Sequence, residues 1–259
     1  MIPLFPSNPD PARFGNKYKS LLTCVATGIK TYANNLAEFH HLLAPEAFSL
    51  GEKGYRVGTW RILPLHTEEE LLDDSFLDAF PERYDTNCPE FHGIYSKRHI
   101  LDAQYTKIPR PIKERILKSQ NWIPWKPELK KLLDEIPLLH RVIGVSVRTW
   151  RASHDNCALA AHRARSFNPQ KYLDIIKKYE KKVEAIFFSF DSPEAEMYFK
   201  DVKIPRMSFP LNQYEPIVQA AIKAQILGNC GLLIGDKLST FPEVAWWMGG
   251  CRADVILVS

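Results

Sequence analysis

The chain has 259 residues, enough for one large domain or for two domains of roughly 100–150 residues each. With 45% hydrophobic and 25% charged residues, it is not a disordered chain and has enough apolar surface for a core. The net charge of +4 is too small to indicate a nucleic-acid-binding protein by itself, although it suits an anionic small ligand if the charge is concentrated.

The five cysteines are widely spaced and include no C-x-x-C pair, which argues against a disulfide framework or a zinc site. The first ten residues have neither the basic nor the apolar region of a signal peptide. No apolar run approaches the roughly 18 residues of a membrane span. We therefore expect a cytoplasmic protein without a membrane span.

The first half of the chain predicts an α/β unit from scattered elements. Strands are expected at residues 21–26 and 56–65. Helices are expected at residues 31–43, 67–80, 111–119 and 127–136. The intervening residues 81–110 carry prolines and polar residues without a clear period.

From residue 141 onward, apolar runs alternate regularly with amphipathic segments. Strands are expected at residues 141–148, 183–189, 206–209, 231–235 and 254–258. Helices are expected at residues 168–181, 192–200, 214–227 and 239–248, with a polar loop after the first strand. This alternation predicts a parallel sheet with right-handed crossovers, so the second half is expected to form a Rossmann-like unit.

Polar groups follow three strands of this predicted sheet, where ligands of open parallel sheets bind. They are Ser146, Arg148, Thr149 and Arg151 after the first strand, Ser189 and Asp191 after the second, and Ser239, Thr240 and Phe241 after the strand at 231–235. Arg148 can bind a phosphate through two parallel N–H bonds, and the hydroxyls of Ser239 and Thr240 open a helix whose free N–H groups face an anion. The pattern predicts a nucleoside-diphosphate pocket, with Asp191 accepting from ribose or base.

Each of these residues also has a purely structural explanation. Ser239 can be an ordinary helix N-cap, Arg148 can be a salt-bridge partner, and Asp191 can be a turn residue. Their joint placement on one rim favours the pocket. The phosphate loops G-x-G-x-x-G and G-x-x-x-x-G-K-[ST] are absent, which argues against a dehydrogenase or a P-loop enzyme.

The same residues carry a resemblance to a known family, the inverting fucosyltransferases, which include α1,2-, α1,6- and protein O-fucosyltransferases. The segment 143–149 resembles the family's first motif, IGVH-x-R-R-x-D, and the segment 186–191 resembles its second, FSDD or ATDD. The segment 222–247 resembles the third motif, which contains STFS. Gly28 resembles a glycine in the family's N-terminal loop, and the other matches span about residues 140–250.

The resemblance implies the GT-B fold, with two Rossmann-like domains. Here a reduced acceptor-side domain would cover residues 1–137 and a donor-binding domain residues 138–259. It implies inverting, metal-independent sugar transfer from a nucleotide sugar, with GDP-fucose the favoured donor, to a glycan or another hydroxyl acceptor, without a cofactor. Arg148 takes the position of the arginine that binds the donor β-phosphate. Ser239 and Thr240 match the hydroxyls that contact the phosphates, and Asp191 matches an aspartate that shapes the donor site.

Three departures from the family pattern affect what can be carried over. Ser146 replaces a histidine that contacts the base, Thr149 replaces a second arginine, and Arg151 replaces an aspartate. Arg151 can replace the lost cation. The resemblance does not define the base and the sugar of the donor, or the catalytic carboxylate. His154 and Asp155, in the polar loop, are the candidate general bases, and Glu243 is a weaker one.

Two other functions are weighed against the enzyme. A decayed site that still binds a nucleotide or glycan would make the protein a binding module. A basic face would suit nucleic acid, although such a face is more often a solvated helix surface, and we expect no nucleic-acid partner. That face consists of Lys107, Arg110, Lys113, Arg115 and Lys118.

Overall fold

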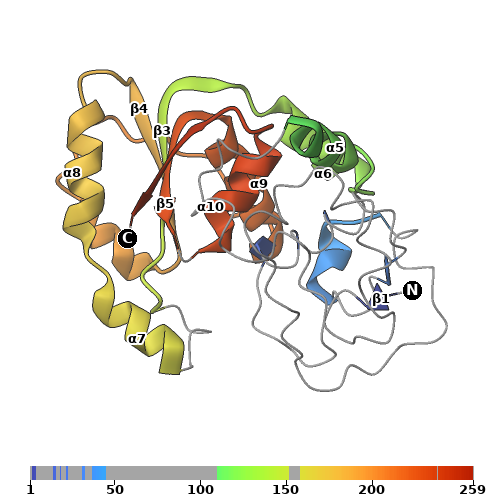
Figure 1. Ribbon diagram of the computed structural model, residues 1–259, viewed down its shortest axis with the longest axis horizontal. Helices are drawn as coiled ribbons and strands as arrows, with labels where there is room; N and C mark the ends of the chain where they lie inside the picture. Colours follow the sequence, from blue (N-terminus) through green and yellow to red (C-terminus); the bar gives the residue numbers. More distant parts are fainter. Residues whose placement is uncertain are drawn as a thin grey trace. The chain divides into compact units, whose positions relative to one another are not determined.

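The computed structural model describes residues 2–3, 14–15, 18, 22, 31–32, 37–44, 110–151, 158–237 and 239–258. The chain divides into two compact units (Figure 1). One unit comprises Met1–Asp134 with Glu215–Val218, and the other comprises Glu135–Tyr214 with Gln219–Ser259.

The second unit is built on a four-stranded sheet in which all the strands run parallel, in the order β4-β3-β5-β6. The strands are β3 (Leu139–Val147), β4 (Ala185–Phe190), β5 (Cys230–Asp236) and β6 (Asp254–Val258). Continuous apolar runs form the central strands because both faces of a parallel sheet are covered. The predicted α/β class with a parallel sheet is confirmed.

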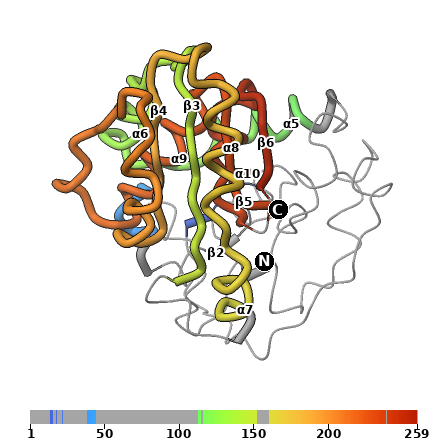
Figure 2. The backbone as a smooth tube through the Cα atoms, turned by 90° about the vertical axis from the view of Figure 1, so that its left-hand side faces the viewer, coloured from blue at the N-terminus to red at the C-terminus, as the bar shows by residue number. Residues whose placement is uncertain are grey.

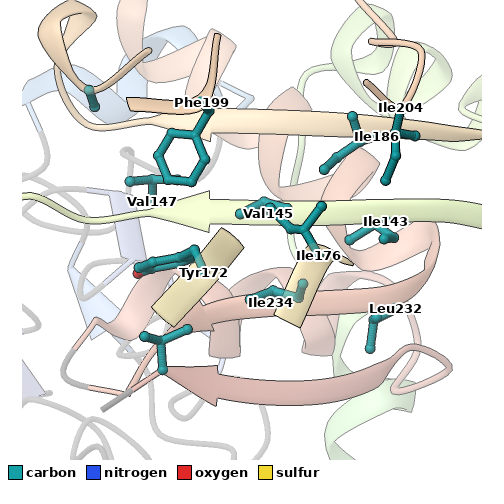
Figure 3. Packing of buried hydrophobic residues seen from close by; sticks show 12 residues of the cluster. Ile143, Val145, Val147, Tyr172, Ile176, Ile186, Phe199, Ile204, Leu232 and Ile234 are labelled. Atoms are coloured by element: carbon teal, nitrogen blue, oxygen red, sulfur yellow. The ribbon is translucent and has the colours of Figure 1, made fainter. Parts of the chain in front are cut away.

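Helices cover both faces of this sheet (Figure 1). On one face lie α8 (Pro169–Tyr179) and the 3-10 helix η5 (Pro193–Phe199), and on the other lie α9 (Pro216–Asn229) and α10 (Thr240–Met248). Alternate residues of a strand face the same side, so Val145 and Val147 pack with Tyr172 of α8 in the core that Figure 3 shows.

The opposite face depends on glycines where backbones approach each other. A Cβ atom on Gly235 of β5 would overlap the Pro242 ring in the first turn of α10. At the other end of α10, a Cβ atom on Gly249 would overlap the backbone of Gly228 in α9, and one on Gly228 would overlap the backbone of Gly249. These positions hold α10 close to β5 at its start and close to α9 at its end.

Most predicted elements of the second half are present, and three differ. Residues 206–209 make a single bridge, between Ile186 and Arg206, because Pro205 and Pro210 enclose a segment too short to extend the sheet. The helix after Ser192 is the 3-10 helix η5. The predicted polar loop after β3 contains an unpredicted helix, α7 (Ala158–Ser166).

The first unit is described in part. It includes β1 (Ile2–Pro3) paired in parallel with β2 (Thr31–Tyr32), and the helices η1 (Ala37–His41), α5 (Arg110–Gln120) and α6 (Pro127–Glu135). Stacked rings are buried in the described part of this unit: the centroid of Phe14 lies 5.4 Å from that of Tyr18 and 6.1 Å from that of Phe39. The Tyr18 hydroxyl donates to Gln120 Oε1 at 3.1 Å.

Two predictions for this unit are wrong, and others cannot be compared. The helix predicted at residues 31–43 is instead the strand β2 followed by η1, and Leu22, in the strand predicted at 21–26, is helical. Gly28, the strand predicted at 56–65 and the helix predicted at 67–80 lie outside the described residues. No helix in the described parts of the chain is both long enough and apolar enough to cross a membrane.

Candidate functional site

The carboxyl ends of three strands lie level with one another at one edge of the sheet. Ser146 of β3 is paired in register with Ser189 of β4 on one side and with Gly235 of β5 on the other. Arg148 follows Ser146 by two positions, and Asp191 follows Ser189 by two positions, as predicted. We call this edge the rim: the ends of β3, β4 and β5 with the residues that directly follow them.

The strand order reverses direction between β3 and β5. From β3 the chain moves outward to β4, returns to β5 on the other side of β3, and continues to β6. The next helix packed on the sheet after β3, α8, covers one face, and the helix that follows β5, α10, covers the other (Figure 1). In open parallel sheets, ligands bind outside the carboxyl ends at such a switch point.

Asp191 organises the segment that follows β3. Its carboxylate accepts hydrogen bonds from Arg148 Nη1 at 3.1 Å, from the Thr149 N–H at 2.8 Å, from Thr149 Oγ1 at 2.9 Å and from the Trp150 N–H at 3.0 Å. The Asp191 side chain is 7% exposed, so these donors replace most of its water. Asp191 therefore shapes the rim from within the protein, and its predicted contact with ribose or base stays a prediction.

Arg148 is held at the end of β3 from two directions. Its side chain is 17% exposed and forms the ion pair with Asp191. Its guanidinium carbon lies 4.5 Å from the centroid of the Trp150 ring, a cation–π contact. A guanidinium has five N–H donors, and the Asp191 bond uses one of them.

Trp150 and Arg163 were not predicted as parts of the rim. Trp150 has a φ of 60°, and its ring contacts a second guanidinium, that of Arg163 on α7, at 4.4 Å. Arg151 points elsewhere: its guanidinium donates to Tyr198 Oη at 3.3 Å and to the Ala164 carbonyl at 3.5 Å. Arg163, and not Arg151, therefore shares the Trp150 ring with Arg148.

The start of α10 supplies the second part of the rim. Ser239 is the N-cap, as predicted, and its hydroxyl accepts the Phe241 N–H at 3.3 Å. Thr240 is the first helical residue, and Ser239, Thr240 and Phe241 are all half-buried. The first N–H groups of a helix have no intrahelical acceptor and carry the positive end of its dipole, so this end can bind an anion.

The hydroxyls of Ser146, Thr149, Ser189 and Ser192 are parts of the rim's interior. All four side chains belong to buried residues, and Thr149 is only 2% exposed. Ser146 and Ser189 lie in paired positions on neighbouring strands. Because they are buried, these side chains pack inside the protein at the rim. Their direct contact with a ligand stays a prediction.

Tyr172 of α8 places a buried hydroxyl beneath the rim. Figure 3 shows its oxygen directed toward the carboxyl ends of the strands. No group among the described residues meets the distance and angle of a hydrogen bond to this hydroxyl, although the backbone N–H of Arg148 lies near enough to act on it. Burial raises the pKa of Tyr172, and the nearby carboxylates of Asp236 and Asp191 raise it further, while the backbone N–H of Arg148 acts in the opposite direction.

The predicted general bases fall into two groups. His154 and Asp155 lie outside the described residues, so their role stays a prediction. Glu243 is 1% exposed, and its carboxylate accepts the Trp247 ring N–H at 3.3 Å, which places it in the core beneath α10. In the described ranges, no group of three or more histidine, cysteine, aspartate or glutamate side chains could hold a metal ion.

The fold and the rim together define a Rossmann-like α/β unit with cationic groups at its switch point. No family description matches the chain, and no curated protein matches it in sequence. Among solved structures, POFUT1 in complex with GDP-fucose (crystal form II) has a TM-score of 0.45 at 13% identity, with 96% of each chain covered.

Two further crystal structures of POFUT1 are similar to a comparable or lower degree. The high-resolution complex with GDP has a TM-score of 0.43 at 13% identity, with 96% of each chain covered. In crystal form III, also with GDP, the TM-score is 0.36 at 11% identity, and the match spans 71% of this chain and 59% of POFUT1. Superpositions this loose assign no ligand to any residue of this chain.

Proposed function

We propose that this protein is an inverting, metal-independent glycosyltransferase that uses a nucleoside-diphosphate sugar, with GDP-fucose favoured, and a glycan or other hydroxyl acceptor. The observation that carries the proposal is the position of Arg148. Arg148 directly follows β3 and is held by Asp191. The neighbouring strand, β5, leads into α10, whose N-cap is Ser239. Both anion-binding groups thus flank the switch point of the sheet.

A diphosphate suits this arrangement for electrostatic reasons. A guanidinium can donate two parallel N–H bonds to a phosphate, and a helix N-terminus adds backbone N–H groups and the dipole. Both are held in place before the ligand binds: Arg148 by Asp191 and Trp150, and α10 by its N-cap Ser239. Fixed donors stabilise the charge that develops on a leaving diphosphate more than flexible ones do.

The transfer step follows from these groups. The acceptor oxygen attacks the anomeric carbon as the bond from that carbon to the diphosphate oxygen breaks, so the electron pair leaves with the diphosphate. Arg148 and the start of α10 would stabilise that charge. The acceptor proton would pass to a general base, and we assign this role to His154 or Asp155, which follow the rim in sequence.

Thermal-shift and turnover measurements test the proposal. GDP, UDP, CDP and ADP are added separately, because a ligand that binds the folded protein raises its melting temperature. We expect GDP to give the largest shift. Release of GDP from GDP-fucose, with and without glycan acceptors, then measures turnover, and Arg148→Ala should lower the rate on the order of 10²–10³-fold.

The matched control is Arg141→Ala. Arg141 lies in β3, the strand that Arg148 follows, and is also ion-paired, to Glu184 at 2.7 Å. It lies at the amino end of the strand, with 67% of its side chain exposed. It should leave turnover unchanged. Equal activity of Arg148→Ala and Arg141→Ala would refute the proposal, and a GDP shift without any turnover would identify a binding module instead.

A further inference from the structure

Two arginine side chains from different elements meet on one tryptophan ring at the rim. The guanidinium carbon of Arg148 lies 4.5 Å from the Trp150 ring centroid, and that of Arg163 lies 4.4 Å from it. The two cations are therefore separated by no more than the sum of these distances. Asp191 lies beside Arg148, so this carboxylate and the ring together hold two guanidinium groups at the rim.

The ring that brings them together is itself held in an unusual conformation. Trp150 has a φ of 60°, which side-chain-bearing residues adopt rarely, and its N–H is bound by Asp191 at 3.0 Å. Such backbone persists where surrounding contacts impose it, and it is often found at binding sites. The conformation therefore fixes the ring that both guanidinium groups contact.

Helix α7 brings Arg163 to this position. Figures 1 and 2 both show α7 beside the carboxyl end of β3. Arg151 links the segment that follows β3 to α7, because it comes directly after Trp150 and donates to the carbonyl of Ala164 on α7. Arg163 is half-buried, whereas Arg165 on the same helix is exposed.

We propose that Arg163 is a second phosphate-binding residue of the rim, and that Arg148 and Arg163 together select a diphosphate over a monophosphate. The inference rests on the proposed function, since it concerns the same ligand. A diphosphate carries two adjacent anionic groups, so each guanidinium can bind one of them or both can share the charge.

The rival explanation is that Arg163 only packs α7 against Trp150. Packing would affect the stability of the protein, but it would not distinguish between ligands that differ by one phosphate. The test is therefore the ratio of two affinities, those for GDP and GMP, measured by calorimetry for the whole chain. Inorganic pyrophosphate and inorganic phosphate form a second pair of probes that does not depend on the base.

We expect Arg163→Ala to weaken GDP and pyrophosphate binding roughly 10- to 100-fold, the range for a lost hydrogen bond to a charged group, and to leave GMP and phosphate binding nearly unchanged. Arg163→Lys keeps the charge but loses the planar fork, so it should fall between Arg163→Ala and the unsubstituted protein. Arg165→Ala removes the same charge from the same helix and should change GDP affinity by less than about twofold.

Each outcome decides between the two explanations. Equal losses for GDP and GMP, or a GDP affinity of Arg163→Ala equal to that of Arg165→Ala, would overturn the inference and leave the proposed function standing. Failure of the unsubstituted protein to bind any nucleoside diphosphate would overturn the proposed function itself. If Arg163→Ala does not fold, the GDP-to-GMP ratio of Arg163→Lys decides the question in the same way.

Discussion

Replacing Asp191 should separate the role of its charge from the role of its hydrogen bonds. One oxygen of the carboxylate, Oδ2, accepts from Arg148, from the Thr149 N–H and from the Trp150 N–H, and the other accepts from the Thr149 hydroxyl. Asp191→Asn keeps an oxygen for the first three donors, and its amide can donate to the Thr149 hydroxyl. Asp191→Ala removes every acceptor.

The expected magnitudes differ accordingly. Removing one member of a largely buried ion pair costs about 3–5 kcal/mol, because the remaining charge stays buried, so we expect that loss for Asp191→Ala. Asp191→Asn also removes the counter-charge of Arg148, but it keeps an acceptor oxygen for the first three donors, so it should cost less than Asp191→Ala. The assay is urea unfolding followed by circular dichroism, with the free energy of unfolding taken from the midpoint and slope.

The control for this experiment is another carboxylate paired with an arginine of β3. Glu184 and Arg141 form an ion pair with 62% and 67% of their side chains exposed, and exposed pairs contribute about 0–1 kcal/mol. Glu184→Ala should therefore cost little. If Asp191→Ala destabilises the protein no more than Glu184→Ala does, Asp191 is not the organising residue of the rim.

Three further predictions concern residues around the rim. Tyr172→Phe should leave the free energy of unfolding unchanged or raise it by up to about 1 kcal/mol, because the hydroxyl has no partner among the described residues; a clear loss in urea unfolding would reveal one. Gly235→Ala should lower that free energy by about 1–3 kcal/mol, because the new methyl group overlaps Pro242, whereas Ala253→Gly, a one-methyl change outside this contact, should cost less. Burial raises the pKa of the Cys230 thiol to about 12, so little of the reactive thiolate exists at pH 8, and labelling by a maleimide should be slow in the native protein and fast in urea; equal rates would contradict the burial.

The sequence predicted the central elements of the second unit because their signals are local. The strands β3, β4 and β5 are apolar runs, and Asn168 and Ser239 cap their helices as the pattern indicated. Helix α7 was missed because its nine residues, ALAAHRARS, carry no apolar stripe with helical spacing. The segment 31–43 has such a stripe, yet it forms a strand and a 3-10 helix, since tertiary contacts override a short periodic pattern.

The candidate site was predictable to a similar extent. The register of parallel strands brings Arg148 and Asp191 to one edge, and this follows from sequence position alone. The contact between Arg163 and Trp150 was not predictable, because it depends on where α7 lies relative to β3. Tyr172 was seen only as part of a helix, since nothing in its spacing shows that its hydroxyl points toward the rim.

The two glycine contacts of α10 have a consequence for ligand affinity. At the start of α10, Gly235 leaves room for the Pro242 ring to pack against β5. At its end, Gly228 and Gly249 allow the backbones of α9 and α10 to lie in contact. A helix fixed at both ends presents its first N–H groups already oriented, so the ordering entropy that a loop would lose on binding is lost during folding instead. A substitution at Gly249, nearly three turns from Ser239, should therefore weaken the binding of an anion that Gly249 does not contact.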